Sequence, residues 1–501
     1  MGNVKVNHKD VQALFRGFDR RWPLGRFYYC RYESGEAGTA LLAQIGPLTS
    51  YLGLDDYPDV AKNAALTFRG LRKLELNPEV LEGFPGDFRQ GMRDRARLNR
   101  DVDANKPENW DDVWQKKKGV HLWLGIYAKS PAALQKWHDE FTAWIAARAA
   151  ARGRSNGNGA DTSPDVTLLD TQDVKRFWSD RNTQMHIDDD SSSPTKPVVL
   201  EHFGFRDGVS QPNIQGFNMH QKDDQHGGGR LLPDGSWAPL PPGEFLFGHV
   251  DVMGEIPLAP VPPALSRNGS FMVQRKLEQD VDGFRDYLKQ KAEQVSSSDD
   301  EVVKADYLAA KIVGRKRDGT PLANAKELND FRYMNDLAGT QCPLGAHMRR
   351  ANPRDALGLS KEVCKKNGST LVDRHRVLRR AITYGEPVPA GAKQKDINPD
   401  GQGLMFMTLQ TSITRQFEFV HQQWINFGND LNQGKERDPL VGIQNGRGRL
   451  AIPGGTEKPT VVCGSLPQFV TTRGGDYFFL PGVGAFDRLA DGAFRSINTE
   501  N

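Results

Sequence analysis

Hydrophobic residues along the chain recur at two spacings, one typical of strands and one typical of helices. Apolar and polar positions alternate within residues 119–128, which predicts a strand. Its apolar face is formed by Val120, Leu122, Leu124 and Ile126. Ser130 and Pro131 then supply an N-cap and a first-turn proline. The apolar residues that follow have helical spacing: Leu134, Trp137, Phe141, Trp144 and Ile145. The pattern predicts a strand followed directly by a helix.

The same unit recurs twice in the second half of the chain. Strands are predicted at residues 270–277 and 404–410, with a last one at 477–480. Helical spacing follows the first two of these strands, at Val281, Phe284, Leu288, Phe417, Val420 and Trp424. Sequence identity between the units is slight, so the repeat is one of structure. Strands with one apolar face, alternating with single helices, favour an α+β fold with antiparallel sheets and helices packed on one side.

The amino-terminal region carries weaker patterns. Residues 11–18 and 26–31 predict strands because of their apolar and aromatic content. Residues 63–76 have helical spacing, although Gly70 weakens the helix. Residues 84–92 are rich in Gly and Pro and predict an irregular connection.

A chain of 501 residues exceeds the size at which a single core usually keeps growing. We therefore expect two domains. Residues 227–242 are rich in Gly and Pro and form the predicted boundary, which gives domains at 1–226 and 243–501.

Composition narrows the range of partners and compartments. Lys and Arg number 66 against 63 Asp and Glu, so there is no broad basic field of the kind that nucleic acid requires. No apolar run approaches the length of a membrane span, and the first residues lack the apolar stretch of a secretory signal. The four cysteines lie far apart and form no Cys-x-x-Cys, which disfavours a zinc ribbon, a disulfide framework and covalent haem attachment. A reducing cytoplasm fits best.

The stretch at residues 201–212 holds a candidate catalytic carboxylate. Gly204 and Gly208 flank Asp207, and Pro212 ends the stretch, so a tight turn with positive φ is expected. The alternative is an Asx-turn, in which Asp207 bonds only to its own backbone. His202 fits a structural role better than a catalytic one.

Two further stretches decide between these readings. Residues 342–355 read Cys-Pro-Leu-Gly-Ala-His-Met-Arg-Arg-Ala-Asn-Pro-Arg-Asp, with a single histidine, His347, among three arginines. Residues 378–385 contain Arg379, Arg380 and Tyr384 before a glycine. Together with residues 201–212, they resemble the dye-decolorizing peroxidase family, in its long-chain branch. The resemblance covers most of the chain and implies two ferredoxin-like domains that hold haem b without a covalent link.

The resemblance also implies roles for individual residues. His347 matches the axial ligand of the haem iron, and Asp438 matches the acid that binds its second nitrogen; the alternative for Asp438 is a turn aspartate before proline. Asn352 is a pocket residue of the same pattern. Candidates for pairing the haem propionates are Arg349, Arg350 and Arg354, although any of them can be plain surface charge.

On the other face of the haem, Asp207 matches the family's distal acid, which moves a proton between the two oxygens of hydrogen peroxide. A carboxylate with a pKa near 4 can carry that proton. Arg379 matches the distal arginine that stabilises the leaving oxygen, and a register one residue later would make it Arg380. Tyr384 and Trp424 lie near these elements and are candidate surface sites for oxidising bulky substrates, with core packing as the alternative.

The implied function is a peroxidase that reduces hydrogen peroxide and oxidises dyes, phenols and other organic reductants one electron at a time. A second hypothesis is a haem-binding or iron-releasing protein without true peroxidase turnover, and a third is a haem-free α+β binding module. Asp207 and Arg379 favour the enzyme, because a carrier needs no pair of groups to cleave an O–O bond. The oligomeric state is left open.

Overall fold

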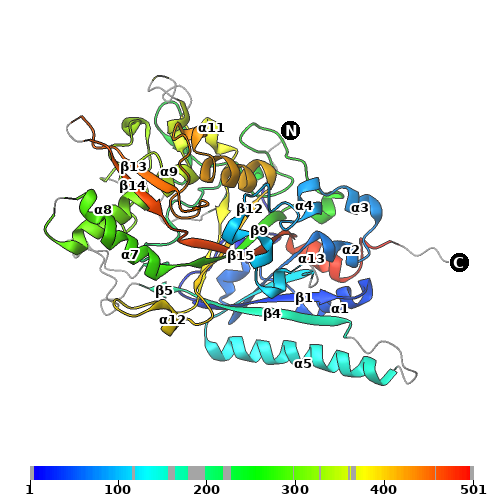
Figure 1. Cartoon of the computed structure of the whole chain (residues 1–501). Coiled ribbons are helices and arrows are strands. Elements are labelled where there is room, and N and C mark those ends of the chain that lie inside the picture. Colours follow the sequence, from blue (N-terminus) through cyan, green and yellow to red (C-terminus); the bar gives the residue numbers. More distant parts are fainter. Residues whose placement is uncertain are drawn as a thin grey trace.

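We describe a computed structural model of the chain. It covers residues 5–115, 119–155, 164–178, 198–217, 227–296, 298–325, 329–358, 362, 368–456 and 459–496. Across these residues, one nine-stranded antiparallel sheet organises the molecule, and helices cover its outside (Figure 1).

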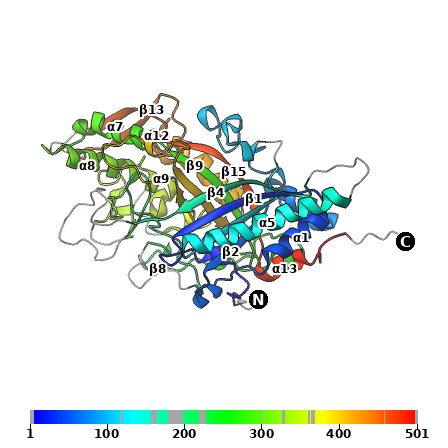
Figure 2. The same cartoon turned by 90° about the horizontal axis from the view of Figure 1, so that it is seen from below.

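The first half of the sheet is formed by residues 24–175. Its strands are β1 (Leu24–Tyr32), β2 (Val60–Leu66), β3 (Leu122–Ala128) and β4 (Val166–Lys175), in the spatial order β4-β1-β3-β2. Two helices connect them, α1 (Gly35–Ile45) and α5 (Pro131–Ser155). Seen from below, α5 crosses in front of the strands, as its apolar positions predict (Figure 2).

The second half repeats this arrangement. Its strands are β9 (Ser270–Gln279), β10 and β11 (Leu378–Arg379 and Ile382–Tyr384), β12 (Gly403–Gln410) and β15 (Val470–Leu480). The order β15-β9-β12-β11 has the fourth strand beside the first, then the third and the second, as in the first half. After β9 come α7 (Val281–Lys291) and α8 (Glu301–Val313), and after β12 the π-helical segments η11 (Thr414–Glu418) and η12 (Val420–Ile425). This β-α-β-β-α-β order is ferredoxin-like, so the predicted α+β fold is confirmed.

The two halves join at both of their outer edges. Thr383 of β11 pairs with Lys175 of β4, and Phe479 of β15 pairs with Leu66 of β2. Because β12 also pairs with β9, the sheet closes into a ring. Each of the two joins is a single residue pair, so the edge strands of the two halves meet at one point on each side. The domain division at 1–226 and 243–501 stays a prediction.

Two buried clusters support the ring. The larger one contains side chains from both halves, including Tyr29, Trp123, Phe271 and Phe479. The smaller one lies between α7, α8 and the stretch before β15, and includes Phe284, Leu308 and Phe469.

Shorter elements complete the described chain. The helices are α2 (Phe68–Lys73), α3 (Pro78–Glu82), α4 (Gly86–Gln90), α6 (Pro263–Ser266), α9 (His347–Ala351), α11 (Thr370–Asp373), α12 (Gln394–Ile397) and α13 (Val483–Ala490). The strands are β5 (Phe177–Trp178), β6 (Val199–Leu200), β7 (Arg230–Leu231), β8 (Trp237–Ala238), β13 (Gly448–Ile452) and β14 (Val461–Leu466). Among the helices that the structure describes, none has both the length and the apolar character that crossing a bilayer requires.

The structure corrects the amino-terminal predictions. Residues 11–18 are not a strand but contain the 3-10 helix η1 (Ala13–Phe15), whose three side chains are all buried. Residues 63–76 are not one helix: β2 occupies the first part, and α2 follows Thr67, whose hydroxyl caps the helix by accepting the Gly70 N–H at 3.1 Å. A Cβ on Gly70 would lie 2.2 Å from the His121 carbonyl, so this glycine permits a close approach. Pairing with β3 overrides the local helical spacing.

A buried ion pair links the region after α4 to the ring. Asp101 and Arg275 are 1% and 2% exposed in their side chains, and Arg275 Nη1 donates to Asp101 Oδ1 at 2.9 Å. We expect Asp101→Ala to lower the free energy of unfolding by about 3 to 5 kcal/mol, because it leaves a buried guanidinium unpaired. Urea titration measures this loss. Asp55→Ala, which breaks the more exposed pair with Arg16, is the control and should cost about 1 kcal/mol or less. Equal losses in the two variants would contradict the prediction.

Candidate active site

His347 is the first residue of α9, where its ring is held by a carboxylate. Nδ1 of His347 lies 2.8 Å from Oδ2 of Asp438, and the histidine side chain is 26% exposed. With Nδ1 engaged by an acceptor, the neutral ring carries its proton there and leaves Nε2 with a free lone pair. The ring is therefore arranged as a ligand.

Asp438 is fully buried and fixed from several directions. Its second oxygen, Oδ1, accepts the N–H groups of Leu440 and Val441, both at 2.9 Å, and its own N–H donates to the Ile425 carbonyl at 2.8 Å. Burial alone would raise the pKa of Asp438, but its interaction with His347 and the hydrogen bond from the Val441 N–H outweigh burial and lower the pKa below its ordinary value. The group therefore stays a carboxylate and a strong acceptor for His347.

The three arginines near His347 differ in what they bind. Arg349 donates to the Cys342 carbonyl at 2.8 Å and contacts Asp336, and Arg350 donates to the Trp424 carbonyl at 2.8 Å. Both therefore hold α9 in place. Arg354 is 2% exposed and hydrogen-bonds Ser210 and the carbonyl of Asn352, while its Nε has no hydrogen-bond partner. Of the three, the geometry favours Arg354 for an anionic ligand.

The loop at residues 201–212 has the predicted glycine geometry. Gly204 and Gly208 have φ of +87° and +78°. The carboxylate of Glu201 accepts the N–H groups of Phe203 and Phe205, each at 2.9 Å, which fixes the start of the loop. Asp207 Oδ1 accepts the neighbouring Gly208 N–H at 2.7 Å, so one oxygen makes the local bond that the alternative proposed.

Arg379 lies on β10 and is tied to this loop. Its Nη2 donates to the Val209 carbonyl at 2.6 Å, and its N–H donates to Gln211 Oε1 at 3.2 Å. Burial lowers the pKa of Arg379, and the nearby charge of Asp207 partly opposes that shift. The structure thus brings Asp207 and Arg379 together. Arg380 instead donates to the carbonyls of Leu14 and Phe15, at 3.0 and 2.6 Å.

Two buried arginines near these residues, Arg315 and Arg376, were missed from the sequence. Arg315 and Arg376 interact electrostatically with Arg379, and Arg376 also with Arg354. Burial lowers the pKa of Arg315 to about 10 and that of Arg376 to about 9, and the like charges nearby add to both shifts. In the described part of the chain, none of these four arginines forms an ion pair. Arg315 belongs to a basic run before Lys316 and Arg317, which is indistinguishable from surface charge in sequence.

The two candidate oxidation sites are not at the surface. Tyr384 and Trp424 are each 3% exposed. Trp424 packs edge-on against His375 and Phe419, with ring centroids 5.2 and 5.3 Å apart. The hypothesis that a bulky substrate contacts either side chain directly is therefore wrong, because core packing decides both positions. An internal electron-transfer role for them stays a prediction.

Comparisons with known proteins find relatives by sequence and by fold. No protein-family model matches the chain. A dye-decolorizing peroxidase of Auricularia auricula-judae is 31% identical over 317 residues, and one of Mycena epipterygia is 25% identical over 97% of this chain and 86% of its own length. The chain is a homologue of the dye-decolorizing peroxidases. Its length is consistent with their long-chain branch.

The extent of these matches differs. The alignment covers 59% of this chain and 57% of the Auricularia relative, so the chain spans less than two thirds of that protein's length. A multifunctional dye peroxidase of Amycolatopsis is 31% identical over 57% of this chain and 60% of its own length.

Solved structures of dye-decolorizing peroxidases share the fold over nearly the whole chain. A DyP-type peroxidase from Anabaena superposes with a TM-score of 0.72 at 23% identity, covering 97% of this chain and 98% of that one. A dye-decolorizing peroxidase in complex with 2,6-dimethoxyphenol gives a TM-score of 0.70 at 21% identity, covering 97% and 100%.

His202, in the loop that carries Asp207, supports the site structurally. It is 2% exposed, and its Nε2 lies 2.8 Å from the Tyr384 carbonyl. Burial lowers the pKa of His202 to about 4, although this hydrogen bond partly opposes the shift. In the unfolded chain the ring takes up its proton near pH 6.5.

We therefore expect the folded protein to lose stability as the pH falls from about 6.5 to 4, because only the unfolded state then binds the proton. This group contributes about 3 kcal/mol to that loss. His202→Gln keeps a donor for Tyr384 but cannot titrate, so its unfolding free energy should change less with pH than that of the wild type. Urea titrations at several pH values measure the difference, and parallel curves would refute it.

Proposed function

We propose that the protein is a haem b peroxidase that binds its cofactor without a covalent link. It would reduce hydrogen peroxide and oxidise organic reductants by one-electron steps. The observation that carries this proposal is the pair formed by His347 and the buried Asp438, with Nε2 left as a ligand. Homology to dye-decolorizing peroxidases supports it, as does one solved structure described as an engineered heme pocket of such an enzyme.

The residues present fit a haem. His347 would bind the iron, and Asp438 would strengthen it as a donor. The guanidinium groups of buried Arg315, Arg354 and Arg376 and of half-buried Arg379 form no ion pair in the described chain, and a haem brings two carboxylates. We assign Arg354 the leading part among them, because it lies seven residues after His347 and its Nε is buried without a hydrogen bond. Asn352 would set the position of Arg354, whose N–H it accepts at 3.2 Å.

Asp207 and Arg379 would perform the proton and charge chemistry of peroxide reduction. A haem would supply the site where the peroxide binds. Asp207 would take a proton from one oxygen of hydrogen peroxide and deliver it to the other oxygen, which leaves. Arg379 would stabilise the negative charge that develops there, in the orientation set by Val209 and Gln211.

The reductants proposed are dyes and phenols, as the names of the relatives and the complex with 2,6-dimethoxyphenol suggest. A haem-binding or iron-releasing protein is the less favoured alternative, because its task requires neither Asp207 nor Arg379. The cytoplasmic location stays a prediction.

The ligand assignment predicts the absorption spectrum. His347→Ala should lose the Soret band of the wild type, or shift it, because the iron loses its protein ligand. His138→Gln, on α5 and bonded to Tyr28, is a control of the same residue type and should keep the wild-type spectrum. An unchanged Soret band at full haem load in His347→Ala would refute the assignment.

The peroxide step gives a second prediction, measured by stopped-flow after mixing with hydrogen peroxide. Asp207→Asn should slow the reaction by about 10²- to 10⁴-fold, because the proton acceptor is lost. Arg379→Leu should slow it by about 10²- to 10³-fold. Arg380→Leu is the matched control, since that side chain bonds Leu14 and Phe15, and its rate should stay within a few-fold of the wild type. If the reaction with peroxide slowed in Arg380→Leu alone, the role proposed for Arg379 would belong to Arg380.

A further inference from the structure

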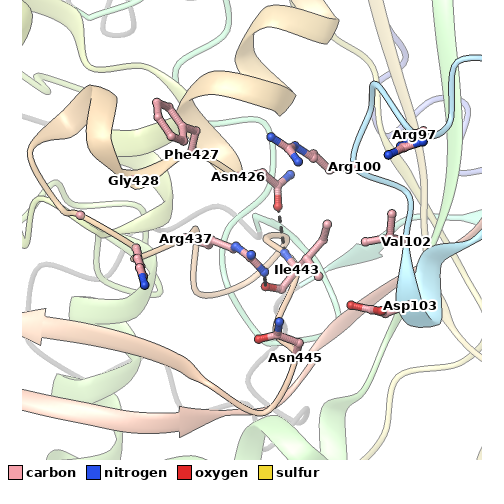
Figure 3. A pocket seen from close by; sticks show the side chains of 12 residues that line it. Arg97, Arg100, Val102, Asp103, Asn426, Phe427, Gly428, Arg437, Ile443 and Asn445 are labelled. Carbon is pink, nitrogen blue, oxygen red and sulfur yellow. Dashed lines mark hydrogen bonds between the residues drawn. The ribbon is translucent and has the colours of Figure 1, made fainter.

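A basic pocket opens between two segments that lie far apart in sequence. It has a volume of about 430 Å³ and is lined by residues 97–103 on one side and 426–445 on the other (Figure 3). Its cationic side chains are Arg97, Arg100, Lys435 and Arg437, against a single carboxylate, Asp103. Within the described residues, none of these cations takes part in an ion pair.

The wall at residues 97–103 is fixed by inward-pointing neighbours. Arg95 pairs with buried Glu418 at 2.6 Å, Asn99 donates to the Tyr477 hydroxyl at 2.6 Å, and Asp101 binds Arg275. Because these residues anchor the segment to the second half of the molecule, the exposed Arg97 and Arg100 between them are held at the pocket. The pocket is thus formed before any ligand arrives, which lowers the cost of binding.

The opposite wall is formed by the turn that also carries Asp438. Arg437 donates to the Ile443 carbonyl at 2.7 Å, and the Asn426 side chain accepts the Ile443 N–H at 3.0 Å (Figure 3). The residue after Arg437 is Asp438, which holds His347. A ligand in this pocket would therefore contact the turn that carries Asp438.

Phe427 adds an apolar surface to this charged lining. Its side chain is 42% exposed and lines the pocket, as do Val102 and Ile443. A lining with four cations and an exposed aromatic ring is complementary to a ligand that has both a negative charge and a ring. The volume is within the range of small-molecule sites.

We propose that this pocket is a binding site for small aromatic carboxylates. The carboxylate would lie between Arg100 and Arg437, and its ring would pack on Phe427. Arg437 would contribute charge from the wall that carries Asp438. The site is separate from the Asp207 and Arg379 face of the candidate active site, and binding there requires neither peroxide nor turnover.

Isothermal titration calorimetry of the purified protein with 4-hydroxybenzoate near neutral pH tests the proposal. Wild-type protein should bind this probe at least tenfold more tightly than 4-hydroxybenzamide, which keeps the ring but lacks the charge. Affinity should fall as salt rises, because the charges at the rim are screened. Absence of binding up to about 10 mM probe, a limit weaker than any specific site of this kind, would overturn the proposal.

Variants locate the site. Arg100→Gln combined with Arg437→Gln should weaken binding at least tenfold, and Phe427→Leu should weaken it several-fold. Lys289→Gln combined with Lys395→Gln removes the same charge from exposed positions elsewhere and should bind like the wild type. Thermal melting of all variants checks that they fold. Equal affinity in the pocket and control variants would overturn the location, and sulfate or acetate competing as well as 4-hydroxybenzoate would overturn the aromatic specificity.

Discussion

Closure of the sheet is the constraint on which the rest of the structure depends. Each half, taken alone, would expose edge strands, and these edges are joined through one residue pair between β11 and β4 and one between β15 and β2. The ring also decides where the functional side chains lie. Arg379 stands on β10 beside β12, and the tie from Arg379 to Val209 brings the Asp207 loop to the same edge. A loop and a strand more than 160 residues apart thereby form one site.

Uncompensated charge is the second organising feature. Placing guanidinium groups in a protein interior costs several kcal/mol each unless an anion or carbonyl oxygens compensate them. Arg349 and Arg350 are compensated by carbonyl groups and Asp336, so they can serve as scaffold. Arg315 and Arg354 keep buried nitrogens without hydrogen bonds. Unlike Arg349, which pairs with Asp336, Arg315 and Arg354 form no ion pair within the described residues, which suits them to an anionic ligand such as a haem propionate.

Sequence alone predicted the elements whose pattern and packing agree. The strand at 119–128 and the helix after Ser130 formed as β3 and α5, since the alternating face meets the core. The predicted helix at residues 63–76 was wrong at residues 63–66, because they pair with β3, and such a long-range contact cannot be predicted from local spacing. In the site, the resemblance to the dye-decolorizing peroxidases singled out His347, Asp207 and Arg379, but Arg315 lies in a basic run whose burial depends on the whole fold. The burial of Tyr384 and Trp424 likewise could not be predicted from the local sequence pattern.

The burial of Tyr384 and Trp424 changes how large reductants can be oxidised. A dye too large to enter the interior can meet neither side chain, so oxidation of such a dye requires an exposed first contact. The basic pocket supplies an exposed aromatic residue, Phe427, but phenylalanine is much harder to oxidise than Tyr or Trp. Its role in the pocket is therefore to position a ring, while the charge around it selects the ligand. Trp424 lies three residues before Phe427, and its carbonyl accepts Arg350 of α9, the helix that begins at His347. A ligand held at Phe427 would thus lie on the segment whose Trp424 carbonyl binds the helix that begins at His347.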